Sequence, residues 1–467
     1  MLYFVEITST INYSERRKLC HQNVQKIFIV ARNLLSKMCA NIVGSLKKVI
    51  FSKGFLARHR NSPKAFTRQR KLPFHLLICF LLNFVKGSYQ DELDKFFQAI
   101  NLFEVAKRVV SKVAFAKARM KLKYEAFIEL NDHLIRAFED TFEPRKWYDH
   151  RLIAIDGSTC QLPRIKEIMD HFGVWNVKPG KPCPIARISQ LFDSLNKISI
   201  SAVISPKSVD ERSHAYQMLS YLMPSDLVLL DRGYPAFWLF KAIDAMGANF
   251  CARINNKWTI VKEFIASGQQ EQILKLHASF SSITTCEQLE LDIEPMTLRL
   301  IRIELNTGEV EVLITTLTDC KAYPTDVFAE LYHLRWPVEE DYKYMKCWLE
   351  IENITGKSVL SVYQDFYAKV FSKNLTSVLS FSTQSELIKS GKKDKYEHQI
   401  NFVQALSKSK DVIVLLFQRT QAKVIELIKN LHEIFANTTE PIRQNRSFQR
   451  NHKVLKRKYY YSYKSIS

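Results

Sequence analysis

The sequence lacks the patterns that would send a protein into a membrane or out of the cell. Its most apolar stretch, residues 72–85, is too short to span a bilayer and contains His75 and Asn83. No basic segment near the N-terminus is followed by an apolar stretch and a small-residue cleavage site, so there is no sign of export. We therefore expect a cytoplasmic protein in which this stretch is a buried helix.

The sequence also lacks paired cysteines. Its 9 Cys residues are scattered, with no Cys-x-x-Cys pair and no metal-like spacing to histidine. This pattern argues against a structural zinc site. We expect these cysteines to be reduced residues of the core.

Acidic residues are outnumbered in this chain. Lys and Arg number 68 against 47 Asp and Glu, which gives a net charge of +21 at pH 7. The excess favours a polyanionic partner such as nucleic acid. An anionic membrane surface would suit the charge equally well, but no long cationic amphipathic helix dominates the sequence, so we expect no membrane partner. A hydrophobic content of 46% is that of a globular protein with a sizeable core.

The N-terminal part has a helical pattern and a strong positive charge. Residues 1–50 are an uncertain helical extension, whereas residues 51–145 show helical spacing over most of their length. Residues 50–75 carry seven Lys or Arg and no acid. Residues 108–127 alternate basic and apolar side chains, which suits a helix lying along a phosphate backbone. For any one of these residues, a solvated cationic helix face is an equally good interpretation.

From about residue 146 the pattern changes to short β-rich runs separated by helical or turn segments. This alternation predicts an α/β domain over residues 146–375. A β-rich stretch at about 256–320 predicts either an insertion or a continuation of the sheet. Helical spacing returns at 376–440, and the tail 441–467, with eight Lys or Arg and no acid, is expected to follow nucleic acid.

Two aspartates come directly after apolar, β-forming residues, where we predict that strands end. Asp156 follows LIAI and Asp231 follows LVLL, and each precedes a segment that contains glycine. In open α/β sheets, functional sites collect at such strand ends. An Asp followed by Gly is also an ordinary way to leave a strand, so one alone is weak evidence. Two in one predicted domain strengthen the hypothesis of a carboxylate site.

A third acid belongs to a row of four polar residues at helical spacing. The row consists of Tyr332, Arg335, Glu339 and Lys346. At about 100° per residue, a single α-helix would present all four within an arc of about 60°. The grouping suits phosphodiester chemistry, in which a carboxylate holds a divalent ion and the cations neutralise neighbouring phosphates.

Three features of this row allow other interpretations. Arg335 and Glu339 form an i,i+4 pair, which is also the spacing of a simple intrahelical salt bridge. Pro337 lies between them and removes a backbone hydrogen bond, so the helix could begin or kink there. Glu340 and Asp341 are neighbouring acids, but they lie about 100° and 200° round the helix from Glu339, so Glu339 is the preferred candidate.

These residues together resemble the DDE transposases of bacterial insertion sequences, in the insertion-sequence-four group that carries the Tyr-Arg-Glu-Lys signature. The signature Y-x2-R-x3-E-x6-K runs without a gap from Tyr332 to Lys346. AIDGST around Asp156 and LDRGYP around Asp231 belong to the resemblance, and the upstream segments FTRQRKLPF and VSKVAFAKARMKL belong to it more weakly. The resemblance covers approximately residues 60–375.

The resemblance implies an α/β fold: a ribonuclease-H-like catalytic domain with a β-rich insertion, flanked by N-terminal and C-terminal helical regions. The N-terminal region, 51–145, would bind DNA, and residues 376–440 would help to pair two protomers. Asp156, Asp231 and Glu339 would be the catalytic residues and the ligands of two Mg²⁺ or Mn²⁺ ions per active site, hard cations that prefer carboxylate oxygen. Tyr332, Arg335 and Lys346 would bind DNA beside the scissile bond.

The function implied is that of a DNA transposase, which cuts at the ends of an insertion sequence and joins them to target DNA. Its partner would be double-stranded DNA, both terminal inverted repeats and target, and it would act as a homodimer in the bacterial cytoplasm, associated with the nucleoid when bound to DNA. Two alternatives stay open. One is a catalytically inactive, transposase-derived DNA-binding protein, which the intact acids argue against. The other is a metal-dependent nuclease of the same fold, which the large flanking helical regions argue against.

Overall fold

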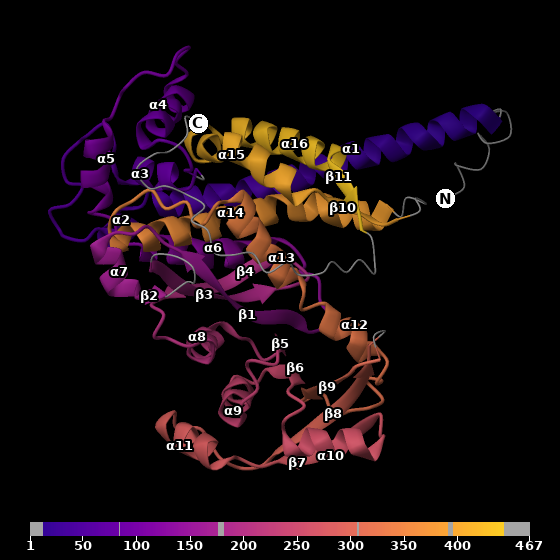
Figure 1. Cartoon of the computed structure of the whole chain (residues 1–467). Coiled ribbons are helices and arrows are strands. Elements are labelled where there is room, and N and C mark those ends of the chain that lie inside the picture. Colours follow the sequence, from indigo (N-terminus) through magenta and orange to yellow (C-terminus); the bar gives the residue numbers. More distant parts are fainter. Residues whose placement is uncertain (1–12, 84, 176–181, 306–307, 391–395, 443–467) are drawn as a thin grey trace.

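The computed structural model describes residues 13–83, 85–175, 182–305, 308–390 and 396–442. Residues 1–12, and the part of the predicted basic tail from residue 443 onward, lie outside the described residues. A layer of helices lies above a long twisted sheet, and further helices lie beneath the sheet (Figure 1).

The upper layer combines helices from both ends of the chain. Those before the first strand are α1 (Tyr13–Ile50), α2 (Lys53–His59), α3 (Phe74–Leu81), α4 (Tyr89–Asn101), α5 (Lys112–Arg119) and α6 (Glu125–Thr141). Those near the C-terminus are α14 (Val359–Ser390), α15 (Phe402–Gln418) and α16 (Gln421–Asn437). Because α1 packs against α16 and α6 packs against α14, the two helical regions share one hydrophobic core.

The apolar stretch at 72–85 forms α3, where Leu77, Ile78 and Phe80 are fully buried, as predicted. Within the described part of the chain, no helix is long and apolar enough to cross a lipid bilayer. The prediction for the cysteines is wrong in part, because Cys320 and Cys347 are exposed rather than in the core.

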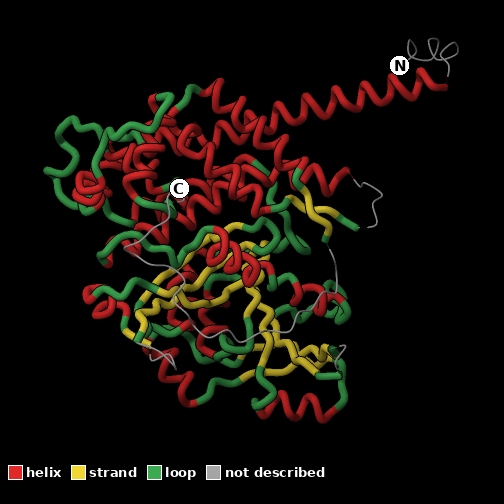
Figure 2. Tube along the Cα trace, turned by 45° about the horizontal axis from the view of Figure 1, so that its top comes forward, coloured by secondary structure: helices red, strands yellow, loops and turns green. Residues whose placement is uncertain are grey.

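The sheet, whose strands are yellow in Figure 2, is mixed and contains the predicted ribonuclease-H-like arrangement. Its strands are β1 (Arg151–Gln161), β2 (Val174–Trp175), β3 (Cys183–Asp193), β4 (Ile198–Ser205), β5 (Asp226–Leu230), β6 (Asn249–Ile254), β7 (Glu271–Leu276), β8 (Met296–Glu304) and β9 (Val310–Thr315). In the order β4-β3-β1-β5-β6, β3 is antiparallel to both its neighbours, and β1, β5 and β6 are parallel. β9, β8 and β7 extend the sheet from β6 by antiparallel pairing, so the strands of the predicted β-rich stretch continue the sheet.

Shorter helices connect and cover the strands. They are α7 (Lys166–Phe172), α8 (Glu211–Met218), α9 (Phe237–Ala245), α10 (Thr259–Ser267), α11 (Phe280–Gln288), α12 (Val327–His333) and α13 (Pro337–Lys343). A small pair of strands, β10 (His398–Ile400) and β11 (Thr439–Pro441), lies apart from the main sheet. α8 packs against β1 and β3, α9 packs against β6, and α14 packs against β4.

The central strands are buried on both faces, which explains their nearly continuous apolar sequences. Alternate side chains enter two hydrophobic clusters, as the two-residue period of a strand requires. Ile153 and Val228 belong to the main core, whereas Leu152 and Leu227 belong to a smaller cluster that includes Leu331 of α12. This smaller cluster fixes α12 against the sheet.

A buried polar network ties α5 to α14. The Arg119 guanidinium donates to the Asp365 carboxylate at 2.6 Å, to the Gln364 side chain at 2.6 Å and to the Ser361 carbonyl at 2.8 Å. The Gln364 amide group donates back to the carbonyls of Arg119 and Leu122. A buried cation with so many acceptors holds α5 firmly on the helical layer.

Candidate active site

Asp156 and Asp231 lie next to each other where β1 and β5 stop pairing. The parallel register pairs Ile155 with Leu230, so the next residue along each strand is one of the two aspartates. β5 ends at Leu230 as predicted, and a turn follows in which the Tyr234 amide donates to the Asp231 carbonyl at 3.0 Å. The two carboxylates are therefore brought to the same edge of the parallel strands.

The strand that carries Asp156 does not end where the sequence predicted. β1 continues to Gln161, and Gly157 pairs with Ser189 of the antiparallel strand β3. A Cβ atom at position 157 would lie 2.9 Å from the Glu211 side chain of α8. The glycine thus marks a close approach of another side chain and not a turn.

The row of four residues is spread over three short helical elements and the connection between the first two, instead of one helix. α12 ends at His333 and α13 begins at Pro337, where the missing N–H costs no helical hydrogen bond. A π-helical turn, Tyr344–Trp348, follows α13. Tyr332 lies on α12, Arg335 in the connection, Glu339 in the first turn of α13 and Lys346 in the π-helical turn. The arc predicted from a single regular helix is therefore wrong, because it assumed one constant angle per residue.

Tertiary contacts nevertheless bring the row to the two strands. Arg335 donates to the Glu339 carboxylate at 2.7 Å, and the Tyr332 hydroxyl lies 3.4 Å from the Asp231 carboxylate. The Lys346 ammonium donates at 2.8 Å to the hydroxyl of Ser158, which lies in β1 close to Asp156.

Two further contacts position α13 and show where its neighbouring acids lie. The Tyr342 hydroxyl donates to the backbone carbonyl of Asp156 at 2.8 Å. Asp341 is buried and accepts a hydrogen bond from Lys373 of α14 at 2.8 Å, whereas Glu340 is exposed. Of the three consecutive acids, Glu339 is the one that pairs with Arg335.

Arg335 is the cation that interacts with all three acidic side chains of the candidate site. Its side chain is only 4% exposed, and its charge acts on both Asp156 and Asp231 in addition to the bonded Glu339. Within the described residues, its Nε and Nη1 are buried without hydrogen-bond partners. Buried donors of this kind need acceptors, and the oxygens of a phosphate group match the planar fork of a guanidinium.

The two aspartates have pKa shifts of opposite direction. Burial raises the pKa of Asp156 to about 6, against the opposing effect of the Arg335 charge. Burial also favours a higher pKa for Asp231. The hydrogen bond from the backbone amide of Arg232 and the charge of the Arg253 guanidinium have a larger opposite effect, so the pKa of Asp231 lies below its ordinary value. Asp231 is therefore the more firmly ionised of the pair.

Sequence reasoning missed Arg253 of β6. Its guanidinium donates to Asp231 at 2.7 Å and also pairs with Glu311 of β9. The only available signal was a basic residue near the end of ANFCARI, the predicted strand that follows the one ending at Asp231. That the two strands are neighbours is a fact of the sheet order.

The acidic side chains of the candidate site carry the kind of oxygen atom that a hard divalent cation binds. Asp156, Asp231 and Glu339 supply carboxylate oxygen, the donor that Mg²⁺ and Mn²⁺ prefer. As they are arranged here, no group of three His, Cys, Asp or Glu side chains among the described residues is close enough to hold a metal ion. In this arrangement the Arg335 guanidinium supplies the positive charge that acts on all three carboxylates.

The sequence is similar to that of known transposases. Residues 147–375 match the family described as a transposase DDE domain. The chain is 21% identical over 392 residues to the transposase InsG for insertion sequence element IS4 of Escherichia coli (strain K12), covering 82% of this chain and 86% of the relative. Among solved structures it is similar to a piggyBac transposase in a synaptic complex with hairpin DNA, with a TM-score of 0.42 and 12% identity over 86% of this chain and 85% of that chain. The segment matched by the family contains every residue of the candidate site.

Proposed function

The chain belongs to the DDE transposases of the IS4 type and is a DNA transposase, and from that premise we propose that Asp156, Asp231 and Glu339 form its catalytic centre. The reaction proposed is metal-dependent cleavage at insertion-sequence ends, followed by strand transfer into target DNA. The observation that carries the proposal is the meeting of Asp156, inside β1, and Asp231, directly after β5, with the Arg335–Glu339 pair.

The proposed metal requirement follows from the donor set. The three carboxylates would hold two Mg²⁺ or Mn²⁺ ions, which when bound supply charge stabilisation to the attacking and leaving oxygens of a phosphodiester. Arg335 would direct its unbonded Nε and Nη1 donors at phosphate oxygens, and Lys346 would add a point charge beside Ser158. Tyr332 would hold its hydroxyl at Asp231 and shape the wall of the site.

The DNA partner proposed is double-stranded, both the terminal inverted repeats and the target. Holding two ends for joining requires two active sites, so we propose a homodimer with the helical region 376–440 in the pairing surface. The protein would act in the cytoplasm.

Arg335→Lys is expected to slow cleavage of a terminal-repeat duplex by about 100-fold, because lysine keeps the charge but loses the planar fork that aligns a phosphate. The midpoint of the Mg²⁺ titration and the affinity for DNA should change little. The measurement is a single-turnover cleavage rate, with DNA affinity measured in parallel.

The matched control is Arg302→Lys, because Arg302 pairs with the exposed Glu304 on β8, outside the candidate site. It should cleave at the wild-type rate. A loss of DNA affinity that accounts for the whole loss of rate in Arg335→Lys would show that Arg335 only binds DNA and does not position the reacting phosphate.

A further inference from the structure

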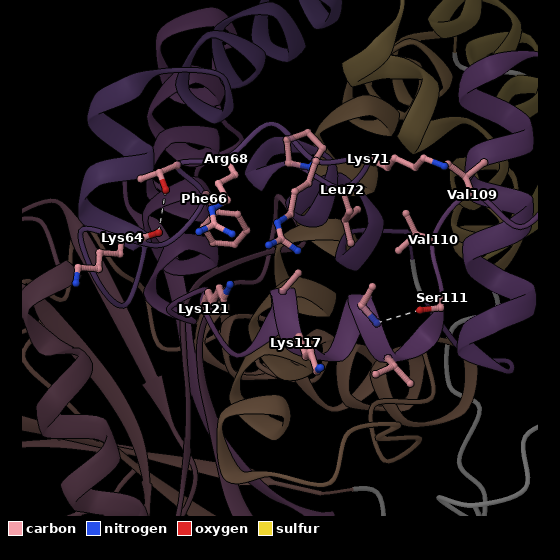
Figure 3. A pocket seen from close by; sticks show the side chains of 16 residues that line it. Lys64, Phe66, Arg68, Lys71, Leu72, Val109, Val110, Ser111, Lys117 and Lys121 are labelled. Carbon is pink, nitrogen blue, oxygen red and sulfur yellow. Dashed lines mark hydrogen bonds between the residues drawn. The ribbon is translucent and has the colours of Figure 1, made fainter.

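Two hollows border the helical layer and differ greatly in size. The larger has a volume of about 990 Å³ and lies between segment 64–73 and residues 109–121 (Figure 3). It falls within residues 51–145, the region that is already expected to bind DNA. The smaller has a volume of about 30 Å³ and lies where the sheet meets α14 and α15. The proposed function makes no use of this smaller hollow.

Four separate parts of the chain line the smaller hollow. Arg145 belongs to the connection between α6 and β1, and Lys197 to the turn between β3 and β4. Ser377 lies on α14, and Phe402 is the first residue of α15. A ligand in the hollow would therefore contact both the catalytic sheet and the C-terminal helices.

The lining of this hollow carries two positive charges and no negative one. Arg145 and Lys197 are its two cations, no Asp or Glu lines it, and within the described part of the chain neither cation forms an ion pair. Asp193 acts on Arg145, and Glu340 on Lys197, only from beyond ion-pair distance. Burial lowers the pKa of Lys197, and the nearby Arg145 charge acts in the same direction. Two like charges beside one small hollow favour an anion between them.

Two hydrogen-bond donors of the lining lack an acceptor among the described residues. They are the Arg145 Nε and the hydroxyl of Ser377, a residue that is only 4% exposed. The Lys197 ammonium donates to the Gln399 side chain at 3.0 Å and has two further N–H bonds. Because Phe402 begins α15, the positive end of that helix also adjoins the hollow. Buried donors of this kind need an acceptor.

The size of the hollow limits the ligand. A volume of about 30 Å³ is enough for one water molecule or an ion of similar size. A nucleotide or a sugar-phosphate chain is too large. A water molecule would accept hydrogen bonds from the Arg145 Nε and the Ser377 hydroxyl, but it would leave both positive charges uncompensated. A small anion would accept the same hydrogen bonds and reduce the repulsion between the charges.

We propose that this hollow is a binding site for one inorganic anion of the size of chloride, held by Arg145, Lys197 and Ser377. The ion ties the turn between β3 and β4 to α14. The site is formed before the ion binds, because the Asn196 side chain donates to the Arg145 carbonyl at 3.1 Å and Lys197 already has a left-handed φ of 57°. The assignment is independent of the catalytic proposal.

The test is thermal melting of the full-length protein at constant ionic strength, while sodium gluconate is replaced stepwise by sodium chloride. Gluconate is too large for the hollow. The variants are Lys197→Met, which removes one charge, and Ser377→Ala, which removes only a hydroxyl. The matched control is Lys146→Met, because Lys146 is exposed and next to Arg145 in the sequence but does not line the hollow.

Chloride is expected to raise the melting temperature of the wild type by about 2 °C with a saturable dependence, because it binds the folded protein. Lys146→Met should respond as the wild type does, and Lys197→Met should lose the saturable rise. In Ser377→Ala the chloride concentration that gives half the effect should increase by about fivefold, the effect of one lost hydrogen bond. A wild type without a saturable rise, or a Lys197→Met variant with the full rise, overturns the proposal.

A second measurement uses the wild type alone and does not depend on how well any variant folds. Crystals of the full-length protein grown with bromide should show an anomalous peak between Arg145 and Lys197. Density for a water molecule only, without an anomalous signal, overturns the proposal. Neither measurement involves cleavage of DNA, so the anion site and the catalytic centre stand or fall separately.

Discussion

Asp156→Asn and Asp231→Asn are each expected to lower the rate of terminal-repeat cleavage by about a thousand-fold, a loss of about 4 kcal/mol of transition-state stabilisation. An amide keeps the size of the side chain but removes the negative charge that would hold a divalent ion. Affinity for DNA should stay near that of the wild type, because the substitution removes no cation that could contact a phosphate. The measurement is a single-turnover cleavage rate at saturating protein.

Asp244→Asn is the matched control, since Asp244 is exposed in the last turn of α9. It should cleave at the wild-type rate. Asp231 also pairs with Arg253, so the melting temperature of Asp231→Asn is measured to separate loss of folding from loss of catalysis. Cleavage near the wild-type rate by either active-site variant would contradict the role assigned to that aspartate.

Lys373→Met is expected to lower the free energy of unfolding by about 3–5 kcal/mol, the usual cost of removing one partner of a buried ion pair. The side chains of Lys373 and Asp341 are 0% and 4% exposed, and the ammonium also donates to the Ser199 hydroxyl at 2.9 Å. Burial holds the pKa of Lys373 below its ordinary value, although the Asp341 charge opposes this shift. Without Lys373, the Asp341 carboxylate would be buried without its counter-charge. Chemical denaturation measures the change.

A second substitution distinguishes this cause from poor packing. Lys373→Met combined with Asp341→Leu should recover most of the lost stability, because two apolar side chains replace the pair without leaving a buried charge. Lys423→Met is the control for an exposed ion pair, since Lys423 and Glu426 are 51% and 56% exposed, and it should cost less than about 1 kcal/mol. A double variant that is less stable than Lys373→Met would contradict the explanation.

The candidate residues could be predicted from the sequence because each belongs to a pattern of residues that are close together in the chain. An aspartate after four apolar residues marks the end of β5, and regular spacing marks the row from Tyr332 to Lys346. The structure brings these residues together, and their catalytic and DNA-binding roles stay predictions. The domain boundaries at 50, 145, 375 and 440 also stay predictions.

Other features depend on tertiary structure and left no local signal. Asp156 lies inside a strand because β3 pairs with β1 beyond the point where β5 stops. The single helix expected for the row is interrupted, and Pro337 was the only local sign of it. The network of Arg119 and Asp365 joins segments that are 246 residues apart in the sequence, which no periodicity reveals.

The most direct test of the central claim compares wild type with Glu339→Gln on a duplex that carries the terminal repeats, at matched DNA binding and with Mg²⁺. Glutamine can still accept a hydrogen bond from Arg335 but carries no charge for a divalent ion. We expect the wild type to give cleaved and joined products that need Mg²⁺, and the variant to bind the ends without giving either product. A wild type that binds the ends but never cuts them, or a variant that cuts as well as the wild type, would contradict the account.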